Sequence, residues 1–258
     1  MTLSPECPLV FLHIPKTAGQ TIHEALTGLA KPEEISPVRL HSQAAPGPAQ
    51  MPPGYSLYSG HLDWVDLEAL PEARFAFTVL RDPFERLASY YLYVLKRAQE
   101  RADEVLEQPS PPHLRGLRRI LTVSTEEYFF GGDADWQAFI RAHYDNFYTS
   151  YFATRRMLGW DAVQAMDEDS AVAAALANVP RLNRIYSIRD LGALERDLAE
   201  RGLVVSVTDK FHRVSEGALQ DRRWPILTDR FESDAGIRKL EAFALRDELF
   251  LHELALQV

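Results

Sequence analysis

The chain has 258 residues, of which 46% are hydrophobic and 25% are charged, close to the averages of ordinary globular proteins. This composition excludes a disordered chain and a coiled coil, and the length suits one α/β domain over residues 1–258. Acidic residues exceed basic ones, 37 against 28, for a formal net charge of −9, so we expect no nucleic-acid partner. An anionic ligand would need a local cluster of cations and backbone N–H groups.

Cysteine and histidine usage narrows the chemistry further. Cys7 is the only cysteine, which excludes an intrachain disulfide and a cysteine-rich zinc site. The histidines are too scattered along the chain to suggest a metal site by spacing, so we expect no metal. No basic segment followed by an apolar one begins the sequence, and no apolar run reaches about 18 residues. We therefore expect a cytoplasmic protein without a signal peptide or membrane span, and its oligomeric state stays open.

The first predicted elements form the start of an α/β unit. Leu9–Ile14 is a short apolar run that ends at Pro15, which is typical of a buried strand. Apolar residues at three-to-four-residue spacing predict a helix over Thr21–Leu29. The stretch from Lys31 to Tyr55 is rich in Pro, Ala and Gln and predicts a long irregular loop.

A second strand and a well-marked helix follow. Asp63 is placed to cap a short helix over Trp64–Leu70, and Phe75–Leu80 is a second apolar run that predicts a central strand. Asp82 can cap the next helix, which we expect over Pro83–Gln99 because a proline suits the first helical position and a glutamate lies three residues after the cap.

The remainder of the chain is predicted to alternate helices with two more strands. Helices are expected over Asp135–Tyr144, Ser170–Asn178, Leu191–Arg201 and Asp234–Leu256, and strands over Arg184–Ile188 and Leu203–Val207. The sequence has no internal repeat and no clear linker.

Two strand-to-helix turns carry residues suited to anions, because backbone N–H groups at a helix start attract negative charge. The first turn joins small residues, a compact positive charge and hydroxyl groups in the run Lys16, Thr17, Ala18, Gly19, Gln20 and Thr21. The lysine precedes the glycine, unlike in the Walker A pattern G-x-x-x-x-G-K-[ST], which counts against an ordinary ATPase or kinase. The alternative is a tight turn with a solvated lysine.

The second turn begins at Arg81, which closes a predicted strand. Ser89 lies about two turns into the following helix, so both residues can reach one anion across the strand end. The alternative is a capped helix whose Arg81 and Arg86 pair with carboxylates. Together the two turns favour a pair of phosphate sites.

The two turns resemble a known family. His13–Gly19 is similar to the 5′-phosphosulfate loop, and Arg81–Ser89 to the 3′-phosphate element, of the sulfotransferases that use 3′-phosphoadenosine 5′-phosphosulfate (PAPS). The likeness is greatest to the carbohydrate, heparan-sulfate-type branch. Ser59–Trp64 resembles the segment that holds a catalytic histidine in these enzymes, and Leu245–Phe250 resembles their final helix.

The resemblance implies a fold and a set of roles. The fold would be an α/β, P-loop-like three-layer sandwich with a mainly parallel central sheet flanked by helices, and PAPS would lie across the carboxyl ends of the strands. Lys16–Thr21 would bind the 5′-phosphosulfate, with Lys16 stabilising the leaving phosphate. Arg81 and Ser89 would hold the 3′-phosphate. His61 would be the general base that takes a proton from the acceptor's hydroxyl or amine.

Several alternatives stay open. The chain could be an ATP-dependent phosphoryl-transfer enzyme or a nucleotide-binding scaffold without turnover, and the base could be a carboxylate such as Asp63. His212–Ser215 could contact the nucleotide or form a solvated loop. The acceptor is expected to be a small molecule or a carbohydrate, and the acidic balance favours a neutral one over a long anionic glycan. We expect acceptor contacts from Lys31–Tyr55 and Val105–Tyr144, because variable covering segments set specificity on a rigid scaffold.

Overall fold

A computed structural model describes residues 3–107, 114–209 and 222–255. Its sheet has four parallel strands in the order β2-β1-β3-β4. The strands are β1 (Leu9–Leu12), β2 (Leu57–Gly60), β3 (Phe75–Leu80) and β4 (Arg184–Ser187). The predictions for the first, third and fourth strands are confirmed, and so is the α/β fold with a parallel sheet.

The register of the sheet decides which residues meet beyond it. Leu12, the last residue of β1, pairs with Gly60 on one side and with Thr78 on the other. The strands are parallel, so their carboxyl ends reach the same edge of the sheet. The turns that follow β1, β2 and β3 therefore meet at this edge, which we call the carboxyl edge.

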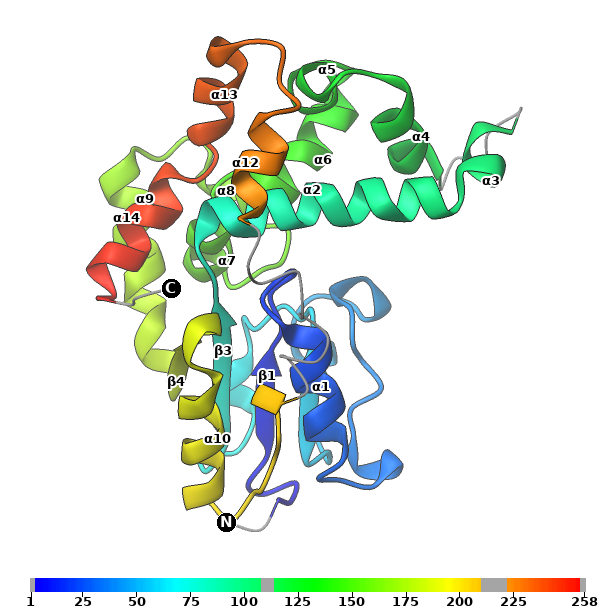
Figure 1. Cartoon of the computed structure of the whole chain (residues 1–258). Coiled ribbons are helices and arrows are strands. Elements are labelled where there is room, and N and C mark those ends of the chain that lie inside the picture. The colour runs from blue at the N-terminus through cyan, green and yellow to red at the C-terminus, as the bar shows by residue number, and fades with distance from the viewer. Residues whose placement is uncertain (1–2, 108–113, 210–221, 256–258) are drawn as a thin grey trace.

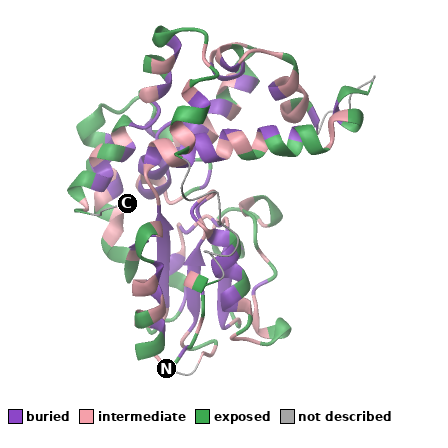
Figure 2. Ribbon diagram, in the orientation of Figure 1, coloured by how far each residue is buried: buried purple, intermediate pink, exposed green. Residues whose placement is uncertain are grey.

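Helices cover both faces of the sheet (Figure 1). One face is covered by α1 (Gly19–Thr27) and α10 (Leu191–Glu200), and the other by α7 (Phe147–Thr154), α9 (Glu168–Asn178) and α14 (Leu245–Glu253). Side chains of β1 alternate between the two cores, as expected for a strand buried on both faces. Figure 2 shows the strands buried and the outward helix faces exposed.

A further group of helices lies beyond the carboxyl edge, above the arrowheads of the strands in Figure 1. Its members are α2 (Pro83–Glu100), α3 (Ala102–Leu106), α4 (Arg115–Thr122), α5 (Thr125–Phe130), α6 (Ala134–Tyr144), α12 (Arg223–Thr228) and α13 (Asp234–Glu241). The short helix α8 (Trp160–Val163) follows α7, and 3-10 turns occupy Pro32–Glu34 (η1), His41–Gln43 (η2), Pro48–Gln50 (η3), Leu67–Ala69 (η4), Val179–Arg181 (η6) and Ile188–Asp190 (η7).

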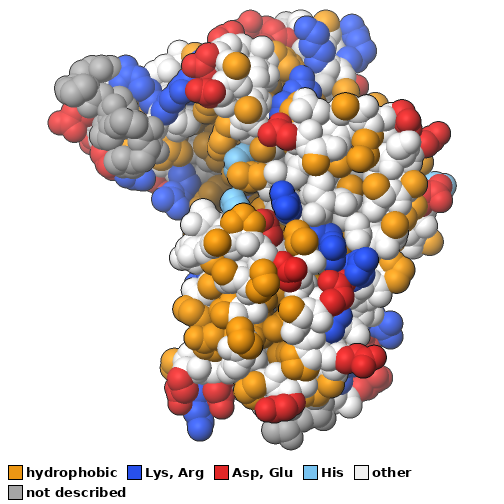
Figure 3. Space-filling model, turned by 180° about the vertical axis from the view of Figure 1, so that it is seen from behind, with side chains coloured by type: hydrophobic (Ala, Val, Ile, Leu, Met, Phe, Trp, Pro, Cys, Tyr) orange, Lys and Arg blue, Asp and Glu red, His pale blue; other side chains and the backbone are white. Residues whose placement is uncertain are grey.

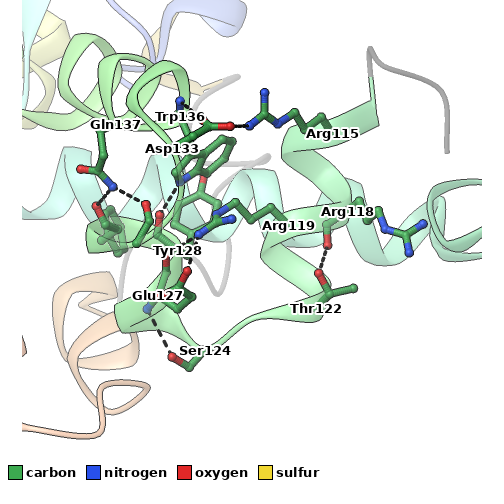
Figure 4. A network of polar contacts seen from close by, with 12 residues as sticks. Arg115, Arg118, Arg119, Thr122, Ser124, Glu127, Tyr128, Asp133, Trp136 and Gln137 are labelled. Carbon is green, nitrogen blue, oxygen red and sulfur yellow. Dashed lines mark hydrogen bonds and ion pairs between the residues drawn. The ribbon is translucent and has the colours of Figure 1, made fainter.

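Polar contacts hold the loops of this helical group. Trp136 Nε1 donates to the carbonyl oxygen of Tyr128 at 2.7 Å, and Arg119 donates to the Glu127 carboxylate at 2.7 Å (Figure 4). These bonds fix the α5–α6 connection while aromatic rings fill the core beneath it. Across the described ranges, no helix is both long enough and apolar enough to cross a membrane.

Several predicted boundaries are confirmed or corrected. The Asp82 side chain caps α2 by accepting from Glu85 N at 2.9 Å, as predicted. The first helix begins at Gly19, two residues before the predicted start. The helix predicted over Trp64–Leu70 is wrong, because only the η4 turn forms there and the Asp63 side chain accepts instead from Met157 N at 2.8 Å.

Two predictions for the carboxyl-terminal half of the chain are wrong for identifiable reasons. Residues 203–207 form no strand, because Val207 N donates to the Glu195 carboxylate at 2.6 Å instead of to a neighbouring strand. The closing helix predicted over Asp234–Leu256 is two helices, α13 and α14, in the part that the structure describes. Between them, the Asn146 side-chain amide donates to Ala242 O at 3.0 Å and the Asn146 backbone N–H donates to Phe243 O at 2.6 Å. These two bonds end the regular helix.

Asp247 provides a test of how α14 is attached. Its buried carboxylate accepts from Tyr148 N at 3.0 Å and from Thr149 N at 2.8 Å, at the start of α7. We predict that Asp247→Ala lowers the free energy of unfolding by about 3 kcal/mol, because buried donors lose their acceptor. Urea unfolding followed by circular dichroism measures the change.

Glu253→Ala is the matched control, because Glu253 is an exposed carboxylate on the same helix. It should change the free energy of unfolding by less than about 0.5 kcal/mol. Equal losses in the two variants would contradict this account of Asp247.

Candidate active site

The turn between β1 and α1 has the backbone geometry of an anion site. Lys16 and Ala18 both adopt positive φ, 73° and 64°, which is uncommon for residues other than glycine. The Thr17 hydroxyl, fully buried, donates to the carbonyl oxygen of Ile14 at 2.9 Å and holds the turn from beneath. No acidic residue lies in the first turn of α1, so the positive end of that helix has no carboxylate of its own there.

Gly19 allows this turn to pack against a histidine. A Cβ atom at Gly19 would lie 1.7 Å from the His13 ring, so no larger residue fits without a shift. The His13 ring stacks on Phe11, with centroids 5.5 Å apart, and lies 4.1 Å from the ring of His61. The turn and the predicted base therefore contact the same side chain.

His61 follows β2 directly and is oriented by a single hydrogen bond. Its Nδ1 lies 2.6 Å from the carbonyl oxygen of His13. A carbonyl can only accept, so Nδ1 carries the proton and Nε2 keeps its lone pair in neutral imidazole. Burial lowers the pKa of His61 below its usual value, the bond to His13 opposes this, and the charges of His41 and Arg39 lower it further. His61 is thus neutral at pH 7 and able to accept a proton.

The long loop before β2 forms a wall beside His61. It is irregular, as predicted, and it runs alongside β2: His61 N donates to Arg39 O at 2.8 Å, and His41 N donates to His61 O at 2.7 Å. A Cβ at Gly60 would lie 2.3 Å from the Arg39 carbonyl oxygen, so this approach requires glycine. The buried Gln50 side chain donates to His41 O at 2.9 Å and closes the loop on itself.

Three cations meet at the carboxyl edge. Burial lowers the pKa of Lys16 to about 8, with further lowering by Arg223 and then by Arg81. Burial also lowers the pKa of Arg81, and Arg223 adds to this while Glu85 opposes it. Lys16 Nζ lies 4.2 Å from the centre of the Tyr93 ring and has no carboxylate partner among the described residues. The cluster of Lys16, Arg81 and Arg223 has the charge and the partial desolvation of an anion site.

The second predicted turn is only partly free to bind a ligand. Arg81 pairs with Glu85 at 3.0 Å, and Glu85 also accepts from the backbone N–H groups of Arg223 and Trp224 at 3.0 and 3.1 Å. Ser89 is 5% exposed on α2. In this structure Arg81 is therefore paired with a carboxylate, as the alternative for the second turn predicted.

Among the described residues, Arg86 has no carboxylate at hydrogen-bond distance, contrary to that alternative. It is 1% exposed, donates to the carbonyl oxygen of His143 at 3.1 Å, and lies 4.6 Å from the centre of the Phe147 ring. Arg86 thereby joins α2 to the end of α6 and the start of α7, whose residues His143 and Phe147 line the cavity of the site.

A cavity of about 610 Å³ joins these parts. It is lined by His13, Pro15, Lys16, Ala18, Gly19, Gln20, Thr21, Leu40, His41, Ser42, His61, Tyr90, Tyr93, His143, Phe147, Met157 and Leu158. The structure thus brings five predicted 5′-phosphosulfate residues together with His61. Thr17 lies beneath the turn, and Arg81 and Ser89 are not part of the lining. In Figure 3, histidine side chains lie in the recess between the two parts of the molecule.

Tyr93, His143 and Arg223 are among the residues of the site that were not predicted as site residues. Tyr93 has only the apolar spacing of an amphipathic helix. His143 lies in Val105–Tyr144, which was expected to supply acceptor contacts but carries no recognised motif. Arg223 reaches Lys16 through the packing of α12 on α2, where Phe84 and Trp224 have ring centroids 4.8 Å apart. No local pattern in the sequence signals any of the three. His212–Ser215 lies outside the described residues.

Within residues 3–107, 114–209 and 222–255, no group of three or more His, Cys, Asp or Glu side chains is placed to hold a metal ion.

Residues 1–185 match the model of a family described as the sulfotransferase family. A search of curated proteins finds no match to the chain. The matched region contains β1, β2, β3 and the first two residues of β4, together with the turns that follow β1, β2 and β3.

The cation cluster makes the pKa of Lys16 depend on Arg223. We predict that Arg223→Ala raises the pKa of Lys16 above about 8, because the largest repulsive charge near the ammonium group is removed, while burial and Arg81 continue to hold the pKa below its usual value. Nuclear magnetic resonance of the labelled lysine side chain measures this shift. Arg230→Ala, an exposed arginine on the same segment, is the control. An unchanged Lys16 pKa in Arg223→Ala would contradict the cluster.

Proposed function

We propose that this chain, which belongs to the sulfotransferase family and so transfers sulfuryl groups, takes the group from PAPS and passes it to a hydroxyl or amine of a small-molecule or carbohydrate acceptor. The observation that carries the proposal is one cavity lined both by Lys16, from a cluster of three cations, and by the neutral base His61. An anion site beside an oriented base is what in-line transfer to a weak nucleophile requires.

The residues at the carboxyl edge fit such a donor. Lys16 is partly desolvated without a carboxylate partner in the described part of the chain, and the first turn of α1 lacks an acid. The cavity volume of about 610 Å³ is in the range that suits a small-molecule ligand. When bound, PAPS supplies the sulfuryl group together with a leaving phosphate that carries negative charge.

Each residue proposed to bind the donor has its own task, and for Arg81 and Ser89, which lie outside the cavity lining, the task comes from the family resemblance. Lys16 stabilises the negative charge that grows on the leaving phosphate, while the backbone of Ala18–Thr21 holds the 5′ side at the start of α1. Arg81 and Ser89 hold the 3′-phosphate. For this, Arg81 exchanges its ion pair with Glu85 for the phosphate, a change favoured by the higher charge of the ligand.

His61 acts as the general base. Its Nε2 accepts the proton of the acceptor's hydroxyl or amine as the sulfur–oxygen or sulfur–nitrogen bond forms. The carbonyl oxygen of His13, 2.6 Å from Nδ1, orients the ring and stabilises the imidazolium ion. Asp63 is less suited to this role, because its carboxylate already accepts from Met157 N at 2.8 Å.

The family match favours sulfuryl transfer over the two alternatives from the sequence, ATP-dependent phosphoryl transfer and a scaffold without turnover, and two measurements check this choice. Thermal-shift measurements with PAPS and with ATP separate the first, because only PAPS and its product have a 3′-phosphate for Arg81. The second predicts binding of adenosine 3′,5′-bisphosphate without transfer of label from PAPS to any acceptor.

Two substitutions separate donor binding from proton transfer. Lys16→Ala should weaken binding of adenosine 3′,5′-bisphosphate at least tenfold, because it removes a partly buried charge from the phosphate. His61→Gln should leave that affinity within about twofold but lower kcat at least a hundredfold, the usual scale for losing a general base. Isothermal titration calorimetry and transfer of labelled sulfate measure the two effects.

Lys96→Ala and His252→Gln are the matched controls, since both side chains are exposed and lie outside the cavity. Both should behave as wild type. Unchanged affinity for adenosine 3′,5′-bisphosphate in Lys16→Ala would contradict donor binding by Lys16. Unchanged kcat in His61→Gln would contradict its role as the general base.

The pKa shifts set the pH range of activity. With both substrates far below saturation, the rate reports the free enzyme. The rate should fall as pH drops through the His61 pKa, below 6.5, because the protonated ring cannot accept a proton. It should fall again above about pH 8, as Lys16 loses its charge. Lys16→Arg should move only the alkaline limb to higher pH, and an alkaline limb unchanged in this variant would contradict the assignment.

A further inference from the structure

We infer that the acceptor is a neutral, hydroxyl-bearing molecule with an apolar face, such as an alkyl or aryl glycoside, and not a polyanionic glycan. The inference rests on the proposed function and specifies its acceptor. It is carried by the lining residues outside the donor turn Lys16–Thr21, which together are called the acceptor half of the cavity.

The charges of the lining argue against a polyanion. Among the lining residues, all of them in the described part of the chain, Lys16 is the only lysine, arginine, aspartate or glutamate. The donor's phosphate requires that lysine. Arg39 is close enough to lower the pKa of His61, but it is exposed and is not part of the lining. A sulfated or uronic-acid-rich chain would therefore meet no second cation among the described residues that line the cavity.

The apolar residues of the lining point to an apolar face on the acceptor. Leu40, Tyr93 and Leu158 line the cavity and yet are 43%, 44% and 49% exposed. Exposed large apolar side chains that gather at one recess mark a binding surface, whereas scattered ones do not. Phe147 and Met157 continue this surface inward. An alkyl or aryl group on the acceptor would cover these side chains and shield them from water.

The polar groups of the same half call for hydroxyls. His61 and His143 each have Nδ1 fixed on a backbone carbonyl, that of His13 at 2.6 Å and that of Phe139 at 2.8 Å. Burial lowers the pKa of both rings, so both present a neutral Nε2 acceptor. A hydroxyl on His61 is the one that reacts, and a second hydroxyl on His143 orients the molecule. Two hydrogen-bond acceptors without a cation suit a neutral polyol.

The test compares three probes for binding to the protein saturated with adenosine 3′,5′-bisphosphate: hexyl β-glucoside, methyl β-glucoside and a uronic-acid-containing tetrasaccharide. We expect hexyl β-glucoside to bind at least tenfold more tightly than methyl β-glucoside, because more apolar surface is buried. The tetrasaccharide should bind most weakly. Equal binding of the two glucosides, or tightest binding of the tetrasaccharide, would overturn the inference.

A substitution at the rim locates the effect. Leu158→Asp should weaken hexyl β-glucoside at least fivefold and leave the affinity for adenosine 3′,5′-bisphosphate unchanged. Leu245→Asp is the control, since Leu245 is 48% exposed on α14 and lies outside the cavity. Equal effects of the two substitutions on hexyl β-glucoside would also overturn the inference. If the wild-type protein does not bind adenosine 3′,5′-bisphosphate at all, the proposed function is contradicted. Failure of the acceptor inference and failure of the proposed function are therefore distinguishable.

Discussion

Positive charge at the carboxyl edge of the sheet is held together against its own repulsion. Burial lowers the pKa of both Lys16 and Arg81, the nearby charge of Arg223 lowers both further, and Arg81 adds to the lowering at Lys16. Glu85 offsets part of this repulsion by pairing with Arg81 and by accepting from the first N–H groups of α12. The packing of Phe84 on Trp224 keeps α12 in place. A bound anion relieves the remaining repulsion, so donor affinity and the arrangement of the helices are linked.

His13 joins the turn proposed to hold the donor to His61, the proposed base. Its ring is packed between Phe11 and His61 and leaves no room for a Cβ atom at Gly19. Its carbonyl oxygen fixes the tautomer of His61. A shift of the turn proposed to hold the donor would therefore move the ring of His61. The fold makes this possible because parallel strands bring the residues after β1 and β2 to the same edge.

Local patterns predicted the central part of the fold. β1, β3 and the capped start of α2 combine apolar runs with strong stop and cap signals, and all three are as predicted. β2 was not predicted, because Leu57–Gly60 contains a serine and a glycine and becomes a strand only by pairing with β1. The strand predicted over Leu203–Val207 has suitable β-branched residues, but Glu195 takes one of its backbone N–H groups.

The residues of the candidate site also fall into those that local motifs predict and those that only the packing of the fold brings in. Lys16, His61 and the residues after Lys16 could be predicted, because short motifs at strand ends carry them. Arg223 and His143 could not, since each reaches the site through the packing of distant helices.

A crystal structure of the protein with adenosine 3′,5′-bisphosphate tests the central claim most directly. The account predicts the 5′-phosphate against Lys16 and the start of α1, and the 3′-phosphate on Arg81 and Ser89, with Arg81 turned away from Glu85. A nucleotide bound away from Lys16, or a 3′-phosphate in solvent while Arg81 still pairs with Glu85, would contradict it.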